Sequence, residues 1–181
     1  EAPASASDHD ADLAGTAAAV GDKTVTITNG ASTTITENMF QGGQLYVNDV
    51  TGEGQNFFIK SNASAAVNSS CAIELFMPVH VAMTSQSQCG LAKNPFDGVL
   101  LANTTQLSHA IGMTNNAVTS GYYFWLQTWG PTTGISDAGA PVKGGTIGAS
   151  TTTSGCLSDI ATSVASFPVG HAGTLAGVDG E

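Results

Sequence analysis

Hydrophobic and polar residues alternate with a period of two in several short segments, the first of which begins at residue 24. The clearest segment is 24–28 (TVTIT), which is β-branched throughout and places its apolar side chains on one side of an extended chain. Asn29-Gly30 follows as a turn, and similar runs recur over the next hundred residues. We therefore expect short strands at 24–28, 33–36, 44–47, 56–60, 72–76, 99–102 and 122–129.

Turn residues separate these runs at intervals of roughly 8 to 12 residues, which is typical of β-sandwiches and barrels. The segment 79–91 favours a short strand over a helix, and short apolar runs continue through the Gly-, Ser- and Thr-rich region after Gly130. The pattern contains no long amphipathic helix. The sequence therefore predicts an all-β fold, an antiparallel β-sandwich or barrel with short strands, little helix and an extended N-terminal arm.

The first twenty residues differ from the rest because they are small, acidic and low in complexity. Leu13 and Val20 are the large apolar side chains of this segment. We expect residues 1–20 to form a flexible or extended arm that becomes ordered against a partner, with Leu13 and Val20 as candidate contacts. A chain of 181 residues corresponds to one domain with an arm, so residues 21–181 are expected to form a single β-rich domain.

The charge balance excludes two classes of partner. The chain has 14 acidic residues against four lysines and no arginine, which gives a net charge of -10. Because phosphate backbones repel such a chain, nucleic acid is not an expected partner. No stretch approaches the roughly 20 apolar residues of a membrane-spanning helix, so no membrane partner is expected either.

Neither the cysteines nor the histidines form a recognisable motif. Cys71, Cys89 and Cys156 are odd in number and lack C-x-x-C spacing, which argues against a disulfide framework and against zinc. Buried free thiols are the simpler interpretation, with a Cys71–Cys89 bridge left open. No nucleophile, phosphate-binding or metalloprotease motif is present. We expect no enzyme activity, cofactor or metal, although a carboxylate pair could still be assembled in space.

The segment 122–129 (YYFWLQTW) is the most aromatic part of the chain. On a strand, Tyr123, Trp125, Gln127 and Trp129 would share one face, while residues 122, 124, 126 and 128 would share the other. The face with Phe124 is a normal core face. The face with two tryptophans fits a second core layer, a protein interface or a platform for stacking sugars, and it supplies our candidate interface residues.

This segment also carries a resemblance to known proteins. The run 121–131 (GYYFWLQTWGP) resembles a G-x-Y-F-W-(L/V)-Q-T-x-G-P signature of virion structural proteins of marine tailed bacteriophages, including capsid decoration (cement) proteins. The segment 41–55 and the run 94–99 (NPFDGV) are similar to two segments that precede this signature in those proteins. The resemblance covers roughly residues 40 to 150, and the stop at Glu181 is earlier than in that family.

The resemblance implies a non-enzymatic virion protein that bridges neighbouring capsid subunits. Its expected partners are the major capsid protein and two further copies of itself in a homotrimer. The expected location is the outer surface of the capsid, after synthesis in the host cytoplasm. The acidic balance agrees with an exterior position because it would keep the protein away from packaged DNA.

Two other functions remain open at this point. The Trp125 and Trp129 face also suits a carbohydrate-binding or host-adhesion module, for which both rings would have to lie in solvent. Another virion part, such as a tail or spike subunit, would share the same composition. Exposure of the two indoles in the folded chain therefore separates the functional interpretations from a second core layer.

Overall fold

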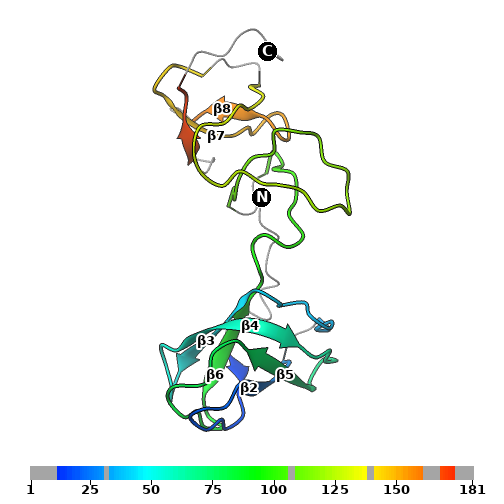
Figure 1. Ribbon diagram of the computed structural model, residues 1–181, viewed down its shortest axis with the longest axis vertical. Coiled ribbons are helices and arrows are strands. Elements are labelled where there is room, and N and C mark those ends of the chain that lie inside the picture. The colour runs from blue at the N-terminus through cyan, green and yellow to red at the C-terminus, as the bar shows by residue number, and fades with distance from the viewer. Residues whose placement is uncertain (1–11, 31–32, 106–108, 138–140, 161–167, 174–181) are drawn as a thin grey trace. The chain divides into compact units, whose positions relative to one another are not determined.

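The computed structural model describes residues 12–30, 33–105, 109–137, 141–160 and 168–173, which form strands, turns and loops without any helix. The expected all-β fold is therefore confirmed. The chain divides into two compact units between Asp97 and Gly98 (Figure 1). We call the first the barrel unit and the second the C-terminal unit, and we describe each by itself.

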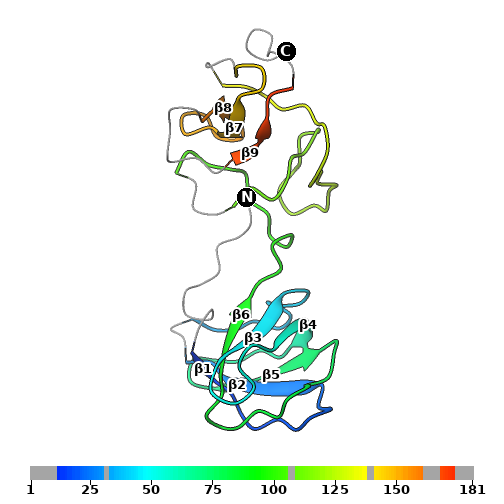
Figure 2. The same ribbon diagram turned by 90° about the vertical axis from the view of Figure 1, so that its left-hand side faces the viewer.

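The barrel unit contains one six-stranded antiparallel sheet with the order β1-β6-β3-β4-β5-β2. Its strands are β1 (Leu13–Ala14), β2 (Thr24–Thr28), β3 (Gln44–Asp49), β4 (Asn56–Asn62), β5 (Ser70–Leu75) and β6 (Gln88–Ala92). The first and last strands of this order also meet. Gly15 pairs with Ile27 of β2, and the Thr16 amide donates to the Thr26 carbonyl at 2.8 Å. The sheet thus forms a nearly closed barrel, in which β1 lies beside both β6 and β2 (Figure 2).

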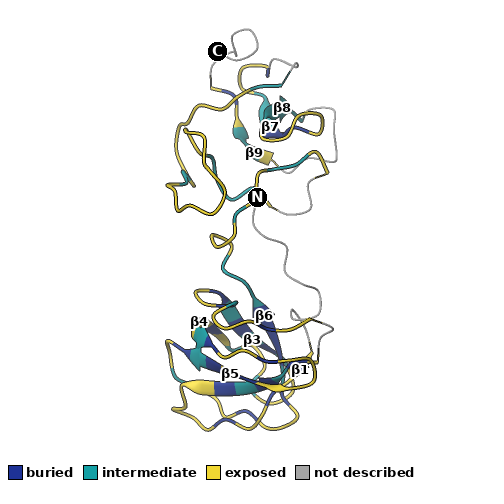
Figure 3. Cartoon of the chain, turned by 90° about the vertical axis from the view of Figure 1, so that its right-hand side faces the viewer, coloured by how far each residue is buried: buried dark blue, intermediate teal, exposed yellow. Residues whose placement is uncertain are grey.

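The predicted alternation directs apolar side chains into the barrel. In β2, Val25 and Ile27 are fully buried while the three threonines are exposed or half-buried. Strands β3, β4 and β5 follow the same period, as the alternating colours of β5 in Figure 3 show. The largest fully buried side chains of the core are Phe40, Ile27, Ile35, Leu45, Ile59, Ile73, Leu75 and Leu91.

A buried asparagine secures the loop that delivers Phe40 to this core. The Asn62 side chain is 3% exposed, and its Oδ1 accepts a hydrogen bond from the Phe40 amide at 2.8 Å. Its Nδ2 donates to the carbonyl oxygens of Thr36 and Ala63, each at 2.9 Å. Backbone groups of a loop can enter an apolar interior only when they find such partners, so Asn62 replaces strand pairing here.

The C-terminal unit contains a smaller three-stranded antiparallel sheet with the order β8-β7-β9. Its strands are β7 (Thr146–Ala149), β8 (Leu157–Asp159) and β9 (Pro168–His171). Residues 135–137 run beside β8, where the Leu157 amide donates to the Ile135 carbonyl at 2.8 Å and the Asp137 amide donates to the Leu157 carbonyl at 2.9 Å. Between the barrel and β7 the described chain consists of loops with an isolated bridge between Met113 and Gln127.

Several sequence-based expectations need correction. The single domain expected at 21–181 is two units, because the barrel core draws all of its side chains from residues before 97. The strands expected at 99–102 and 122–129 are loops, and the one expected at 33–36 is reduced to a bridge between Ile35 and Ala65. The ambiguous segment 79–91 becomes a loop followed by β6.

The expected arm needs a more limited correction. Residues 1–11 lie outside the described chain, whereas the backbone from Leu13 pairs with the barrel of its own molecule. Leu13 is 4% exposed and belongs to the barrel core, because its partner in β6, Cys89, faces the same interior. Ala18 exchanges backbone hydrogen bonds with Met83 at 3.1 and 2.8 Å. This segment is therefore part of the barrel before any partner is added.

All three cysteines are free thiols, so the bridge that the sequence left open between Cys71 and Cys89 is not formed. Both of these side chains are buried in the barrel. Burial raises the pKa of the Cys89 thiol to about 11 and raises the pKa of the Cys71 thiol as well. Since the thiolate is the reactive form, both residues behave as small apolar core side chains.

We predict that Asn62→Ala destabilises the barrel. The change leaves the buried Phe40 amide without its partner, which should lower the free energy of unfolding by about 1–3 kcal/mol. The Thr36 carbonyl still accepts a hydrogen bond from the Met39 amide. Urea unfolding followed by far-ultraviolet circular dichroism measures this loss, and faster amide exchange at Phe40 locates it. Asn56→Ala, on an exposed position of the same strand, is the matched control and should change stability by less than about 0.5 kcal/mol. Equal effects of the two variants would contradict the role assigned to Asn62.

Candidate aromatic surface

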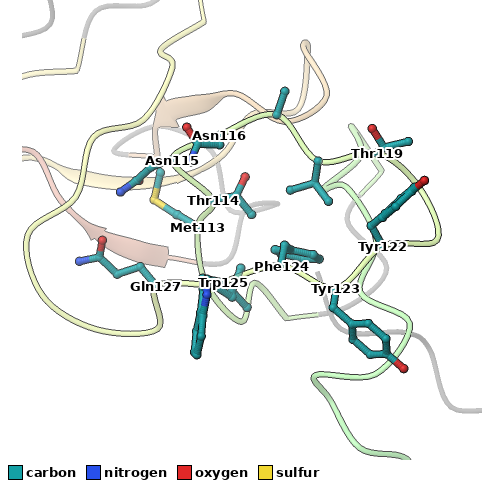
Figure 4. Close-up of a pocket in the computed structure, with 13 residues that line it drawn as sticks. Met113, Thr114, Asn115, Asn116, Thr119, Tyr122, Tyr123, Phe124, Trp125 and Gln127 are labelled. Carbon is teal, nitrogen blue, oxygen red and sulfur yellow. The ribbon is translucent and has the colours of Figure 1, made fainter.

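The candidate interface face is presented by a loop of the C-terminal unit. Trp125 is 98% exposed, Trp129 is 91% exposed and Tyr123 is fully exposed. Of the alternatives that the sequence left open, the second core layer is therefore excluded for these three side chains. Tyr122 is 73% exposed and joins them. Figure 4 shows the rings of Tyr123 and Trp125 pointing outward from the loop. We call Tyr122, Tyr123, Trp125 and Trp129 the aromatic surface.

The backbone that carries these rings is closed by a pair of hydrogen bonds. The Met113 amide donates to the Gln127 carbonyl, and the Gln127 amide donates to the Met113 carbonyl, both at 2.9 Å. Such a reciprocal pair fixes two chain segments in antiparallel register. Residue 112, next to this pair, has to be glycine because there is no room for a side chain. A Cβ at this position would lie 2.6 Å from the Gln127 carbonyl oxygen and 2.7 Å from Cγ of Leu126.

The Gln127 side chain fixes the next turn. Its Nε2 donates to the Trp129 carbonyl at 3.2 Å and to the Pro131 carbonyl at 2.7 Å. Gly130, between these two acceptors, has a φ of 96°, a left-handed conformation that favours glycine. Gln127 was predicted to be part of the interface itself, but it is half-buried and acts instead by holding Trp129 in position.

An open hollow of about 650 Å³ lies between the segments 113–119 and 122–127 of this loop. One side is lined by polar residues of the segment 113–119, including Thr114, Asn115 and Asn116. The other side is lined by the aromatic run, where Phe124 lies between the two segments (Figure 4). Thr132 ties the polar side in place because its Oγ1 donates to Asn115 Oδ1 at 2.9 Å.

The whole surrounding segment is free of formal charge. Between Asp97 and Asp137 the sequence contains no Asp, Glu, Lys or Arg, although the chain as a whole carries a net charge of -10. Leu100, Leu101 and Ile135 in this segment are also exposed by more than half. A neutral surface rich in apolar side chains is the usual composition at the centre of a protein interface.

The two remaining candidate interface residues behave differently from each other. Leu13 is a core residue of the barrel and offers no surface for a partner. Val20 is 65% exposed beside the turn at Gly21, so it stays available for contact.

The expected alternation of faces along 122–129 placed Tyr122 on the core side. This was wrong because the segment is a loop and not a strand. The absence of charge from 98 to 136 was the sequence signal for the larger surface.

The hydroxyl of Ser150 and the carboxylate of Asp137 form a hydrogen-bonded pair of the kind found in some catalytic sites. Ser150 is 1% exposed, and its Oγ donates to Asp137 Oδ2 at 2.5 Å. The same oxygen accepts hydrogen bonds from the amides of Thr152 and Thr153, each at 3.0 Å. A hydroxyl that is buried and occupied in this way stabilises a turn and cannot reach a substrate.

No further catalytic or metal site emerges from the described residues. They contain no group of three or more His, Cys, Asp or Glu side chains arranged to hold a metal ion. None of their elements is a helix long and apolar enough to cross a membrane. In comparisons with known proteins, no family model, no curated protein and no solved structure matches this chain. The aromatic surface is therefore the feature on which a function has to be built.

We predict that Gly112→Ala disturbs the aromatic surface without unfolding the barrel. The added Cβ overlaps the Gln127 carbonyl, so the paired hydrogen bonds between residues 113 and 127 should open at a cost of about 1–3 kcal/mol. Faster hydrogen exchange at the Met113 and Gln127 amides measures the opening. Gly170→Ala serves as control, because a Cβ there meets nothing within 4 Å. Unchanged exchange in Gly112→Ala would show that the bridge does not hold the loop.

Proposed function

We propose that this chain is a non-enzymatic virion protein that decorates the outer surface of a bacteriophage capsid and stabilises it by bridging capsid subunits. The observation that carries the proposal is the aromatic surface, which exposes four large rings within a charge-free segment. Isolated exposed apolar residues are common on soluble proteins, but four exposed rings within eight residues of one loop support a contact with another macromolecule. The resemblance of residues 121–131 to capsid decoration proteins names the partner.

The rest of the molecule supports a structural role. The Ser150 hydroxyl is buried, and burial raises the pKa of the Cys71 and Cys89 thiols, so none of these three side chains is presented as a nucleophile. The nearly closed barrel pairs its strands with one another, so it has little unpaired edge through which particles could aggregate. A protein that occurs in many copies on a shell needs this property, since symmetry multiplies every unwanted contact as well as every useful one.

We predict that the purified full chain binds to capsids that lack it and raises the temperature at which they open. Binding should saturate at a fixed ratio of decoration protein to capsid subunit, and cryo-microscopy should place the chain at regular positions on the outer surface. A contact made through neutral apolar side chains should survive an increase from 0.1 M to about 1 M salt, whereas a merely electrostatic coat is screened away. Capsids that bind nothing, or that open at an unchanged temperature when coated, would contradict the proposal.

A second candidate function is the binding of neutral carbohydrate. It is favoured by the exposed indoles of Trp125 and Trp129 and by the hollow beside them, whose lining combines aromatic rings with asparagine and threonine side chains. If this function holds, neutral oligosaccharides should shift the tryptophan fluorescence saturably, and Trp125→Ala should abolish the shift. Absence of any shift at millimolar saccharide would remove this candidate.

A further inference from the structure

The segment that follows β2 begins with the only Asn-Gly pair of the sequence, Asn29-Gly30. In an unfolded chain this pair is chemically labile, because the glycine has no Cβ that hinders its backbone nitrogen from attacking the asparagine side chain. The attack forms a bond from the glycine nitrogen to Cγ of the asparagine, the bond from Cγ to Nδ2 breaks, and ammonia leaves. Water then opens the resulting succinimide ring to aspartate or isoaspartate.

The folded barrel holds the labile side chain of Asn29 away from this reaction. Asn29 is completely buried, and its backbone amide donates to the Ser69 carbonyl at 2.9 Å. Its Nδ2 donates to the carbonyl oxygens of Thr33 at 3.0 Å and of Ala65 and Ala66, each at 3.2 Å. To meet the nitrogen of residue 30, the side chain has to turn away from these acceptors and Nδ2 has to leave them. The reaction therefore requires this part of the barrel to open.

The product of the reaction does not fit the place that Asn29 occupies. A carboxylate has no hydrogen to donate, so one of its oxygens would replace Nδ2 opposite three carbonyl oxygens. A buried charge without donors is strongly unfavourable, and the three carbonyls lose their donor at the same time. Isoaspartate also lengthens the backbone, which disturbs the hydrogen bond to Ser69. A barrel that has been modified is thus favoured to stay open.

We infer that Asn29 is a deamidation site that is closed in the folded barrel and accessible in the opened barrel, so that the modification turns a temporary opening into a lasting one. The inference concerns the barrel unit by itself and does not depend on the proposed function. Because opening and closing are fast compared with deamidation, the rate should follow the fraction of barrels that are open. The folded chain should therefore react at least about 1,000-fold more slowly than the denatured chain.

The test incubates the full chain at mildly alkaline pH, with and without denaturing guanidinium chloride, and follows residue 29 by peptide mass spectrometry. The denatured chain should be converted while the folded chain keeps its amide. Gly30→Ala is the matched control, because a Cβ at residue 30 meets nothing within 4 Å and the φ of Gly30 is not in the left-handed region. It should fold normally and lose most of the conversion in denaturant. Conversion of the folded, unaltered chain at the rate of the denatured chain would overturn the inference.

A second measurement connects the rate with opening of the barrel. Just below its unfolding temperature, Asn62→Ala should be converted at residue 29 faster than the unaltered chain, by the factor by which it shifts the measured unfolding equilibrium. For the loss of stability predicted above this factor is about 5- to 150-fold. Asn56→Ala should leave the rate unchanged, and small additions of guanidinium chloride should accelerate the unaltered chain. A rate that stays constant while the unfolding equilibrium shifts would contradict the inference.

The variant Asn29→Asp tests whether the modified barrel can close again, since it carries one product of the reaction. It should unfold at a clearly lower concentration of guanidinium chloride than the unaltered chain, because Nδ2 no longer serves its three acceptors. Asn56→Asp adds the same charge at an exposed position of the barrel and should unfold like the unaltered chain. Equal midpoints for Asn29→Asp and Asn56→Asp would show that the modified barrel closes normally and would overturn the inference.

Discussion

Closure of the six-stranded sheet by the N-terminal segment is the interaction on which the barrel unit depends. This segment pairs with β6 through Leu13 and with β2 through Gly15 and Thr16, so one short stretch satisfies the backbone groups of two strands. Without it, β2 and β6 would both present unpaired edges. The side chain of Leu13 enters the core at the same place. Backbone pairing and apolar burial therefore reinforce each other at the point where the sheet closes.

The C-terminal unit is stabilised in a different way, and this difference explains why the aromatic surface lies there. Its loops are held by discrete hydrogen bonds, such as the Met113–Gln127 pair and the two bonds donated by the Gln127 side chain. The barrel, by contrast, is stabilised by large apolar side chains buried in its interior. A segment fixed by its backbone and by one amide side chain does not have to bury its rings, so Trp125 and Trp129 are free to face solvent.

The sequence predicted the barrel strands well because their two faces differ in environment. At 24–28, 44–47, 56–60 and 72–76 one face packs inside and the other meets water, so the alternation of side chains records the structure directly. The same reasoning failed at 122–129, where β-branched and aromatic residues belong to an exposed loop. The strand propensity of a residue reflects how well its side chain packs on a half-buried sheet. It therefore does not predict the conformation of a segment that has no neighbouring strand to pair with. The exposure of the rings was therefore beyond what periodicity could decide.

The arm illustrates a second limit of sequence reasoning. Residues 12–20 have the small side chains and low complexity of a disordered segment, yet they complete the barrel. They are held by backbone hydrogen bonds to segments far along the chain as well as by the burial of Leu13 and Ala18, and composition does not report such partners. The aromatic surface presents the opposite case, since its apolar composition left burial as one of the open alternatives, whereas the folded chain keeps these rings exposed. An exposed and neutral group of rings on an otherwise acidic chain is a persistent driving force for association.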